Sequence, residues 1–198
     1  MDQILQLLFT GIGIGSVYAL VALGFVLIFR ATNVVNFAQG EFSMVAAFLM
    51  VVFAVDLQWP YWLSFLISLG GMALFGVIFN LGVYYPLRHR TFLPVIIATI
   101  GASIFLANSV LAIYGPAPQV LEGWFETPGI QLGPVYLDSQ YLLIIAVTIA
   151  LVILNYWFFE HTMLGKKLQA TSQDKEMASL LGISVSSMIM ITFIYSAV

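Results

Sequence analysis

Long uninterrupted apolar runs alternate with short polar segments along this chain. A membrane-spanning helix needs about 20 consecutive apolar residues, whereas the strands of a membrane barrel are short and alternate in polarity. The runs are of the first kind, and the N-terminal run lacks the basic start of a cleaved signal peptide, so we expect it to be retained. The pattern predicts five full spans, over residues Ile4–Phe29, Val34–Val55, Tyr61–Tyr84, Phe92–Tyr114 and Tyr141–Phe159.

A sixth apolar run begins near Met188 and reaches the end of the sequence at Val198. Because this run is too short to cross a bilayer, it predicts only the start of a further span. We therefore expect one transmembrane domain over residues 1–198 that is incomplete at its C-terminus.

Composition agrees with this pattern and excludes several classes of protein. Hydrophobic residues make up 62% of the chain and charged residues only 8%, far from the balance of a soluble domain. Together with the long runs, this predicts an all-α, polytopic membrane protein. The chain has no cysteine, and its two histidines, His89 and His161, lie in separate polar loops, so we expect no metal site and no cofactor. The net charge of −3 offers no basic patch for nucleic acid.

The six cations predict the orientation of the chain. They follow the first, third and fifth spans, which places all of them on one side of the membrane: Arg30, Arg88, Arg90, Lys166, Lys167 and Lys175. Positive residues favour the cytoplasmic side, so the N-terminus is expected outside. The loop over residues 115–139, which carries acids and no cation, is then external. It is interpreted either as a solvated connector or as a docking surface for an external partner.

A polar decapeptide, TNVVNFAQGE, opens the second apolar run. If Val34–Val55 is one helix, four small or polar residues share a face, namely Asn36, Gln39, Gly40 and Ser43. This face is interpreted as the lining of a translocation pathway or gate, and the alternative is hydrogen bonding that holds helices together. Glu41 points about 140° away from Asn36 on such a helix and is assigned a structural or gating role.

Small residues recur every fourth position in the first span, at Gly11, Gly15 and Ala19. Such a ridge is typical of close packing between membrane helices. A nucleotide-binding loop is excluded because the segment lacks the lysine of a phosphate-binding motif and lies within the membrane.

The segment over residues 160–185 is predicted to be a cytoplasmic loop that contains a short helix. Thr171 or Ser172 is expected to cap this helix, and Gly182 to end it. The helix would present an apolar face flanked by charges, either to lipid headgroups or to a groove on a cytoplasmic partner.

Two sequence motifs, with their order and flanks, resemble a known family. They are TNVVNFAQGEF, which follows a first span containing GIGSVYAL, and GKKLQATSQDKEMASLLGI between the fifth and sixth runs. Over essentially the whole chain, they resemble the shorter of the two permease types of branched-chain amino acid importers of the ATP-binding-cassette class. Gln169 departs from the family, in which an arginine is common at that position.

The resemblance implies a multi-pass permease subunit of the bacterial inner membrane that is not itself an enzyme. Its implied partners are a second permease subunit, as a homodimer or heterodimer, two cytoplasmic ATP-binding subunits, an external solute-binding protein and a small-molecule solute. The coupling of ATPase movement to transport is carried over onto the loop residues Asp174, Lys175, Glu176, Met177, Ala178, Leu181 and Gly182.

Two other functions were weighed against this one. A stand-alone secondary transporter or channel would also explain the buried polar face, and its uptake would follow an ion gradient instead of ATP. An intramembrane enzyme using Ser103 and His161 is excluded, because Ser103 would lie about 16 Å deep while His161 lies at the membrane face.

Overall fold

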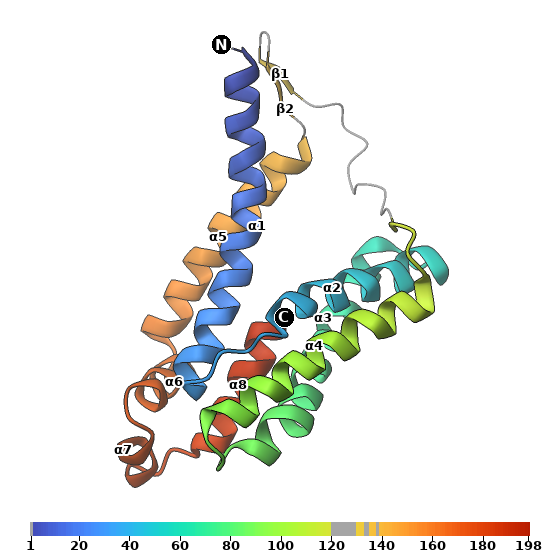
Figure 1. Ribbon diagram of the computed structural model, residues 1–198. Coiled ribbons are helices and arrows are strands. Elements are labelled where there is room, and N and C mark those ends of the chain that lie inside the picture. The colour runs from blue at the N-terminus through green and yellow to red at the C-terminus, as the bar shows by residue number, and fades with distance from the viewer. Residues whose placement is uncertain (1, 120–129, 133–134, 138) are drawn as a thin grey trace. The chain divides into compact units, whose positions relative to one another are not determined.

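The computed structural model describes residues 2–119, 130–132, 135–137 and 139–198 (Figure 1). Five helices in these ranges are long and apolar enough to cross a membrane. They begin with α1 (Asp2–Thr32), followed by α2 (Gln39–Val51), α3 (Tyr61–Phe79), α4 (Phe92–Tyr114) and α5 (Ser139–His161). A π-helical turn extends α2 to Asp56, and a π-helical turn and a 3₁₀ turn extend α3 to Leu87. The prediction of a polytopic helical membrane protein is confirmed.

Three shorter helices follow the fifth span. They are α6 (Met163–Gln173), α7 (Lys175–Leu180) and the apolar α8 (Val185–Ala197), which corresponds to the predicted start of a further span. Two short antiparallel strands, β1 (Ile130–Leu132) and β2 (Val135–Leu137), were not predicted within the loop over residues 115–139. The docking interpretation of that loop concerns residues that lie largely outside the described ranges, and it stays a prediction.

The chain divides into two compact units, Met1–Ala22 with Glu122–Lys166, and Leu23–Leu121 with Lys167–Val198. In the first unit, α5 runs beside the first part of α1 (Figure 1). Gly13 is buried there, and a Cβ atom at this position would lie 2.5 Å from Tyr141 Cδ1. The close approach of α1 and α5 therefore requires a glycine at position 13.

The predicted small-residue ridge is not the face of α1 that contacts α5 in the described residues, and a packing role for it stays a prediction. Gly11, Gly15 and Ala19 are exposed, and no heavy atom lies within 4 Å of a Cβ built on Gly11 or Gly15. Within the described residues, no helix packs closely on this ridge. The every-fourth spacing identified a face of α1, but the neighbouring helix α5 lies against the face that carries Gly13.

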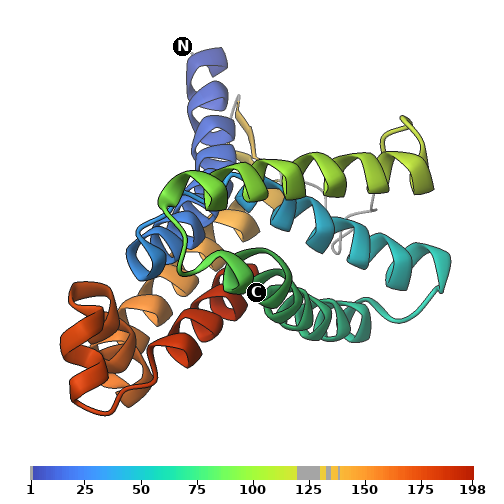
Figure 2. The same cartoon turned by 60° about the horizontal axis from the view of Figure 1, so that its bottom comes forward.

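Aromatic rings form the core of the second unit. Phe42 of α2 packs edge-on against Phe75 and Phe79 of α3, with ring centroids 5.1 and 4.9 Å apart. Phe79 also contacts Phe193 of α8 at 5.9 Å. Helices α3 and α8 lie side by side (Figure 2), because Gly76 of α3 lets the α8 backbone come within van der Waals distance.

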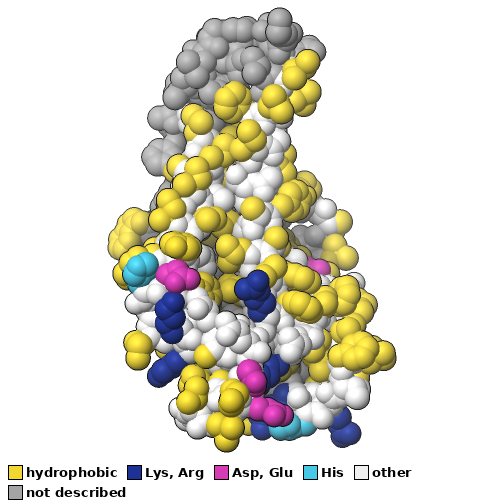
Figure 3. All heavy atoms as spheres, turned by 90° about the vertical axis from the view of Figure 1, so that its left-hand side faces the viewer, with side chains coloured by type: hydrophobic (Ala, Val, Ile, Leu, Met, Phe, Trp, Pro, Cys, Tyr) yellow, Lys and Arg dark blue, Asp and Glu magenta, His cyan; other side chains and the backbone are white. Residues whose placement is uncertain are grey.

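The outer faces of the spans are strongly apolar. Large side chains on α4 illustrate this, since Phe105 is 70% and Ile113 75% exposed. Figure 3 shows hydrophobic side chains covering much of the face that it presents. Surfaces of this kind are unfavourable in water, so this exposure is the arrangement expected for helices in contact with lipid or with other membrane subunits.

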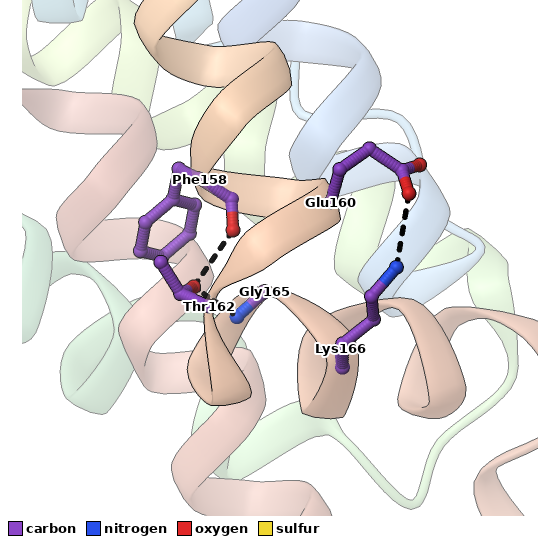
Figure 4. Close-up of polar contacts among 5 residues, drawn as sticks. All are labelled: Phe158, Glu160, Thr162, Gly165 and Lys166. Carbon is purple, nitrogen blue, oxygen red and sulfur yellow. Dashed lines mark hydrogen bonds and ion pairs between the residues drawn. The ribbon is translucent and has the colours of Figure 1, made fainter.

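A short elbow joins α5 to α6, and its polar contacts are local (Figure 4). The Thr162 hydroxyl donates to Phe158 O at 2.7 Å and accepts from Gly165 N at 3.0 Å. The second bond satisfies an N–H group in the first turn of α6, as an N-cap does. Lys166 Nζ forms an ion pair with Glu160 Oε2 at 3.0 Å across the same elbow.

Candidate functional site

Residues 33–38 of the polar decapeptide connect α1 to α2, and its last residues form the start of α2. Asn33 adopts a left-handed conformation with φ of 61°, which ends α1, and asparagine tolerates this conformation better than most residues. The Asn36 side chain then accepts from Ala38 N at 3.1 Å, forming a local turn. Helix α2 consequently begins only at Gln39. The expectation of one helix over Val34–Val55 is wrong, because these two asparagines stabilise turns.

This later start separates the four residues of the predicted polar face. Asn36 and Gln39 are buried, with exposed fractions of 2% and 5%. Gly40 and Ser43 lie on an exposed part of α2. The predicted continuous stripe is therefore two groups, one enclosed by protein and one open on the surface of this chain.

Gln39 is held by a polar network that joins three helices. Its Nε2 donates to Ser196 Oγ of α8 at 3.0 Å, and Ser196 Oγ donates to Gly24 O of α1 at 2.9 Å. A Cβ at position 24 would lie 2.8 Å from both Gln39 Nε2 and Ser196 Oγ, so only glycine leaves room for the network. Sequence reasoning did not identify Ser196 or connect Gly24 with Gln39, because no spacing rule links residues so far apart in the chain.

The two buried amides are only partly satisfied. Within the described part of the chain, Asn36 Nδ2 and Gln39 Oε1 have no hydrogen-bond partner. Leaving a buried polar atom unpaired costs about 1–3 kcal/mol, so native structures rarely do so without a reason. One free donor and one free acceptor thus lie close together in sequence at the start of α2.

The Glu41 side chain contacts a different helix from the one that Gln39 contacts. It is partly buried, and its Oε1 accepts from Ser103 Oγ of α4 at 3.0 Å. Another contact between the same regions is Phe37 N, which donates to Thr99 Oγ1 at 3.3 Å. The carboxylate therefore has a specific neighbour on α4, and the Ser103 hydroxyl is engaged with it.

The predicted cytoplasmic helix is present but starts later than expected. Helix α6 continues through Thr171 and Ser172 to Gln173, so neither residue is the cap. Asp174 is the N-cap of α7, and its Oδ1 accepts from Glu176 N at 2.9 Å and Met177 N at 3.0 Å. The expected cap was wrong because Thr171 and Ser172 are still part of α6, and Asp174, an equally good capping residue, is the first position after it that can accept from the N–H groups of α7.

One face of α7 is buried and the other is open. Ala178 is only 1% exposed, whereas Met177, Leu180 and Leu181 are 59%, 80% and 78% exposed. Gly182 follows with φ of 79°, a left-handed conformation that ends the helix at low cost only for glycine. The chain thus presents a short helix with an exposed apolar surface.

Lys175 links this helix to the decapeptide. Its Nζ donates to Thr32 O, at the C-terminal end of α1, at 3.0 Å. A cation at this end of a helix interacts favourably with the unpaired carbonyls of the last turn. Burial lowers the pKa of Lys175 from its usual range, because the ammonium group loses water.

The site has no arrangement of side chains typical of a metal centre. Across the described ranges, no three His, Asp or Glu side chains are grouped as metal ligands are. The chemistry that these residues offer is hydrogen bonding by amides and hydroxyls, by the Glu41 carboxylate and by the Lys175 ammonium group.

Comparisons with known proteins identify similar chains. The model of the family described as "Branched-chain amino acid transport system / permease component" matches residues 7–198. The high-affinity branched-chain amino acid transport system permease protein BraD of Pseudomonas aeruginosa is 30% identical, over 98% of this chain and 67% of that protein. The LivH permease proteins of Salmonella typhimurium and Escherichia coli K12 are each 28% identical with the same coverage. No solved structure matches the chain significantly.

Proposed function

The chain belongs to the branched-chain amino acid transport system permease family, and from this premise we propose that it is the membrane-spanning subunit of an ATP-driven importer. Its solute on this proposal is a branched-chain amino acid, as in the names of its relatives. Five apolar helices support a multi-pass position in the plasma membrane. The orientation proposed, with the N-terminus outside, rests on the six cations that follow the first, third and fifth spans. The subunit hydrolyses nothing; separate ATP-binding subunits supply the energy.

The proposed partners follow from the surfaces of the chain. Two ATP-binding subunits dock on the cytoplasmic side, where Met177 of α7 and its C-cap Leu181 present exposed apolar side chains flanked by Glu176. A second permease subunit covers part of the exposed apolar surface of the spans. A solute-binding protein delivers the amino acid to the external loops, including residues 115–139.

The contact between Lys175 and Thr32 is the observation that carries the proposed mechanism. Helix α7 moves with the docked ATPase, and the bond from Lys175 Nζ to Thr32 O transmits this movement to the segment that leads to Asn36 and Gln39. The coupling set on this proposal is Asp174, Lys175, Glu176, Met177, Ala178, Leu181 and Gly182.

Asn36 and Gln39 form the proposed gate. Gln39 is held between α1 and α8, while Asn36 Nδ2 and Gln39 Oε1 have no hydrogen-bond partner among the described residues. Displacement of the segment exposes one amide donor and one amide acceptor to a passing polar solute. Gly40 and Ser43 border the route on the exposed face of α2, and Glu41 positions α2 against α4 through Ser103.

Uptake by the reconstituted complex tests the function. We expect radiolabelled leucine to enter proteoliposomes that contain the permease, its ATPases and the binding protein only when ATP is present on the ATPase side. Uptake driven by a proton or sodium gradient without ATP would instead establish the alternative, a secondary transporter or channel.

The same assay tests coupling through α7. Asp174→Ala removes the cap of a six-residue helix, at a cost of about 1 kcal/mol, and Asp174→Asn keeps a capping oxygen. We expect Asp174→Ala to reduce leucine uptake about fivefold at unchanged ATP hydrolysis, and Asp174→Asn to stay within about twofold. Equal uptake by Asp174→Ala and the unmodified protein would contradict the coupling role.

A further inference from the structure

A cavity of about 380 Å³ lies in the second unit, at the end of the α3 extension and the start of α8. Its volume is within the range of small-ligand sites. The polar part of its lining includes Tyr84, Arg88, His89, Lys175 and Ser186, and the apolar part includes Ile189. Lys175 is shared with the proposed coupling contact, and the other lining residues have no part in the proposed transport mechanism.

The cavity has an excess of unpaired positive charge. Among the described residues, neither Arg88 nor Lys175 forms an ion pair with a carboxylate. Two contacts fix Arg88: its guanidinium lies 3.6 Å from the centroid of the Tyr85 ring, and its Nε donates to His89 Nε2 at 2.9 Å. Most of the guanidinium donors therefore remain available, in the planar arrangement that binds phosphate oxygens in pairs.

Two neutral groups add donors to the same lining. An imidazole that accepts at Nε2 carries its proton on Nδ1, so His89 can donate from Nδ1. Ser186 lies in the first turn of α8, whose N-cap Ser184 makes no capping bond because its hydroxyl contacts Ser187 Oγ at 2.9 Å. No acidic side chain is among the described residues that line the cavity. A lining of cations and N–H donors is complementary to an anion.

The position of the cavity favours an amphiphilic anion over a soluble one. The apolar span that begins at Tyr61 ends at Leu87, and α8 begins at Val185, so the cavity lies where apolar segments meet polar ones. Three exposed residues lead along α3 toward it at helical spacing, Ile78, Leu81 and Tyr85. An acyl chain can follow this apolar surface while its headgroup reaches Arg88.

We propose that this cavity binds the phosphate headgroup of an anionic phospholipid, with Arg88 and Lys175 contacting the phosphate oxygens. Basic pockets between membrane helices are a recurrent form of lipid site. The site requires only that the chain lies in a membrane, so it does not depend on the solute or on the ATPase.

Native mass spectrometry of the purified full chain in detergent tests this site by titration with phosphatidylglycerol and, separately, phosphatidylcholine. We expect phosphatidylglycerol to bind about fivefold or more tightly than phosphatidylcholine, since each nearby cation contributes a factor of about five. Arg88→Gln should remove most of this preference. Equal affinity for the two lipids in the unmodified chain would overturn the proposal.

Arg90→Gln is the matched control, because it removes the same charge from the same loop at an exposed residue that does not line the cavity. We expect Arg90→Gln to keep the preference for phosphatidylglycerol within about twofold. If both variants lose it equally, the attraction is a general surface effect and the site is refuted. Arg88→Lys keeps the charge and should retain part of the preference for phosphatidylglycerol. That result would show that Arg88→Gln loses the preference through loss of charge and not through unfolding.

A competition experiment separates the lipid from free phosphate. A large molar excess of inorganic phosphate should leave phosphatidylglycerol bound, because phosphate lacks the acyl chains that contact the apolar wall. Complete displacement by inorganic phosphate would show that the cavity recognises a soluble anion and would overturn the assignment to a lipid.

Discussion

At the scale of single residues, this chain uses buried amides where most membrane proteins place apolar side chains. Gln39 donates to Ser196 Oγ, and Asn36 stabilises a turn. In the part of the chain that the structure describes, Gln39 Oε1 and Asn36 Nδ2 have no hydrogen-bond partner. The sequence alone drew attention to both residues, because polar side chains within membrane-length apolar runs are costly. It did not indicate the partner of Gln39, which comes from α8 at the far end of the chain.

Gln39→Met tests the role of the buried amide. Methionine is similar in length and flexibility but offers no amide donor or acceptor. We expect leucine uptake to fall about tenfold, which corresponds to the loss of one net hydrogen bond of about 1.4 kcal/mol, while assembly with the ATPases is unchanged. Gln6→Met, the same change at an exposed residue of α1, is the control and should stay near the unmodified rate. Equal rates for the two variants would show that Gln39 has no part in transport.

At the scale of elements, the presence of each membrane helix was predictable from the length of its apolar run. Where each helix begins or ends depends on individual capping and turn residues. Asn33 and Asn36 stabilise turns ahead of α2, and Asp174 caps α7 by accepting two backbone N–H groups. These residue types are visible in the sequence, but several neighbours compete for each role. Close approach between helices was harder to predict. Gly11 and Gly15 have the four-residue spacing of a helix-packing motif, yet among the described residues no atom of another helix lies within 4 Å of a Cβ built on either of them.

Gly76→Ala tests the closest helix contact of the second unit. A Cβ at position 76 would lie 2.8 Å from Phe193 O and 2.9 Å from Ile194 Cα, both backbone atoms of α8. We expect Gly76→Ala to destabilise the protein by about 1–3 kcal/mol, as overpacking does, measured as a lower thermal midpoint in detergent. Gly70→Ala on the same helix meets no atom within 4 Å and should be neutral or slightly stabilising. Similar midpoints for the two variants would contradict the close packing of α3 and α8.

At the scale of the whole molecule, the six cations predict how the chain is oriented in the membrane. Leu57 follows the second span and is 49% exposed, and Ser179 is an exposed residue of α7. The positive-inside rule places the first outside the cell and the second in the cytoplasm.

The chain has no cysteine, so single cysteines can report this orientation without background. We expect Leu57→Cys to react with a membrane-impermeant thiol reagent in intact cells. Ser179→Cys should react only after the cells are permeabilised. The opposite pattern of labelling would invert the orientation and would place α7 where no cytoplasmic ATPase can reach it.

The sequence by itself determined the membrane class, the number of apolar spans and the two polar segments that interrupt them, because these depend on hydropathy and length. The tertiary structure decided which polar residues are enclosed and what they contact. Gln39 meets Ser196, Glu41 meets Ser103, and Lys175 reaches Thr32, although each pair is far apart in the chain. The physical reason is that burial and hydrogen bonding depend on which helices face each other. Hydropathy records only how apolar each segment is and contains no such information.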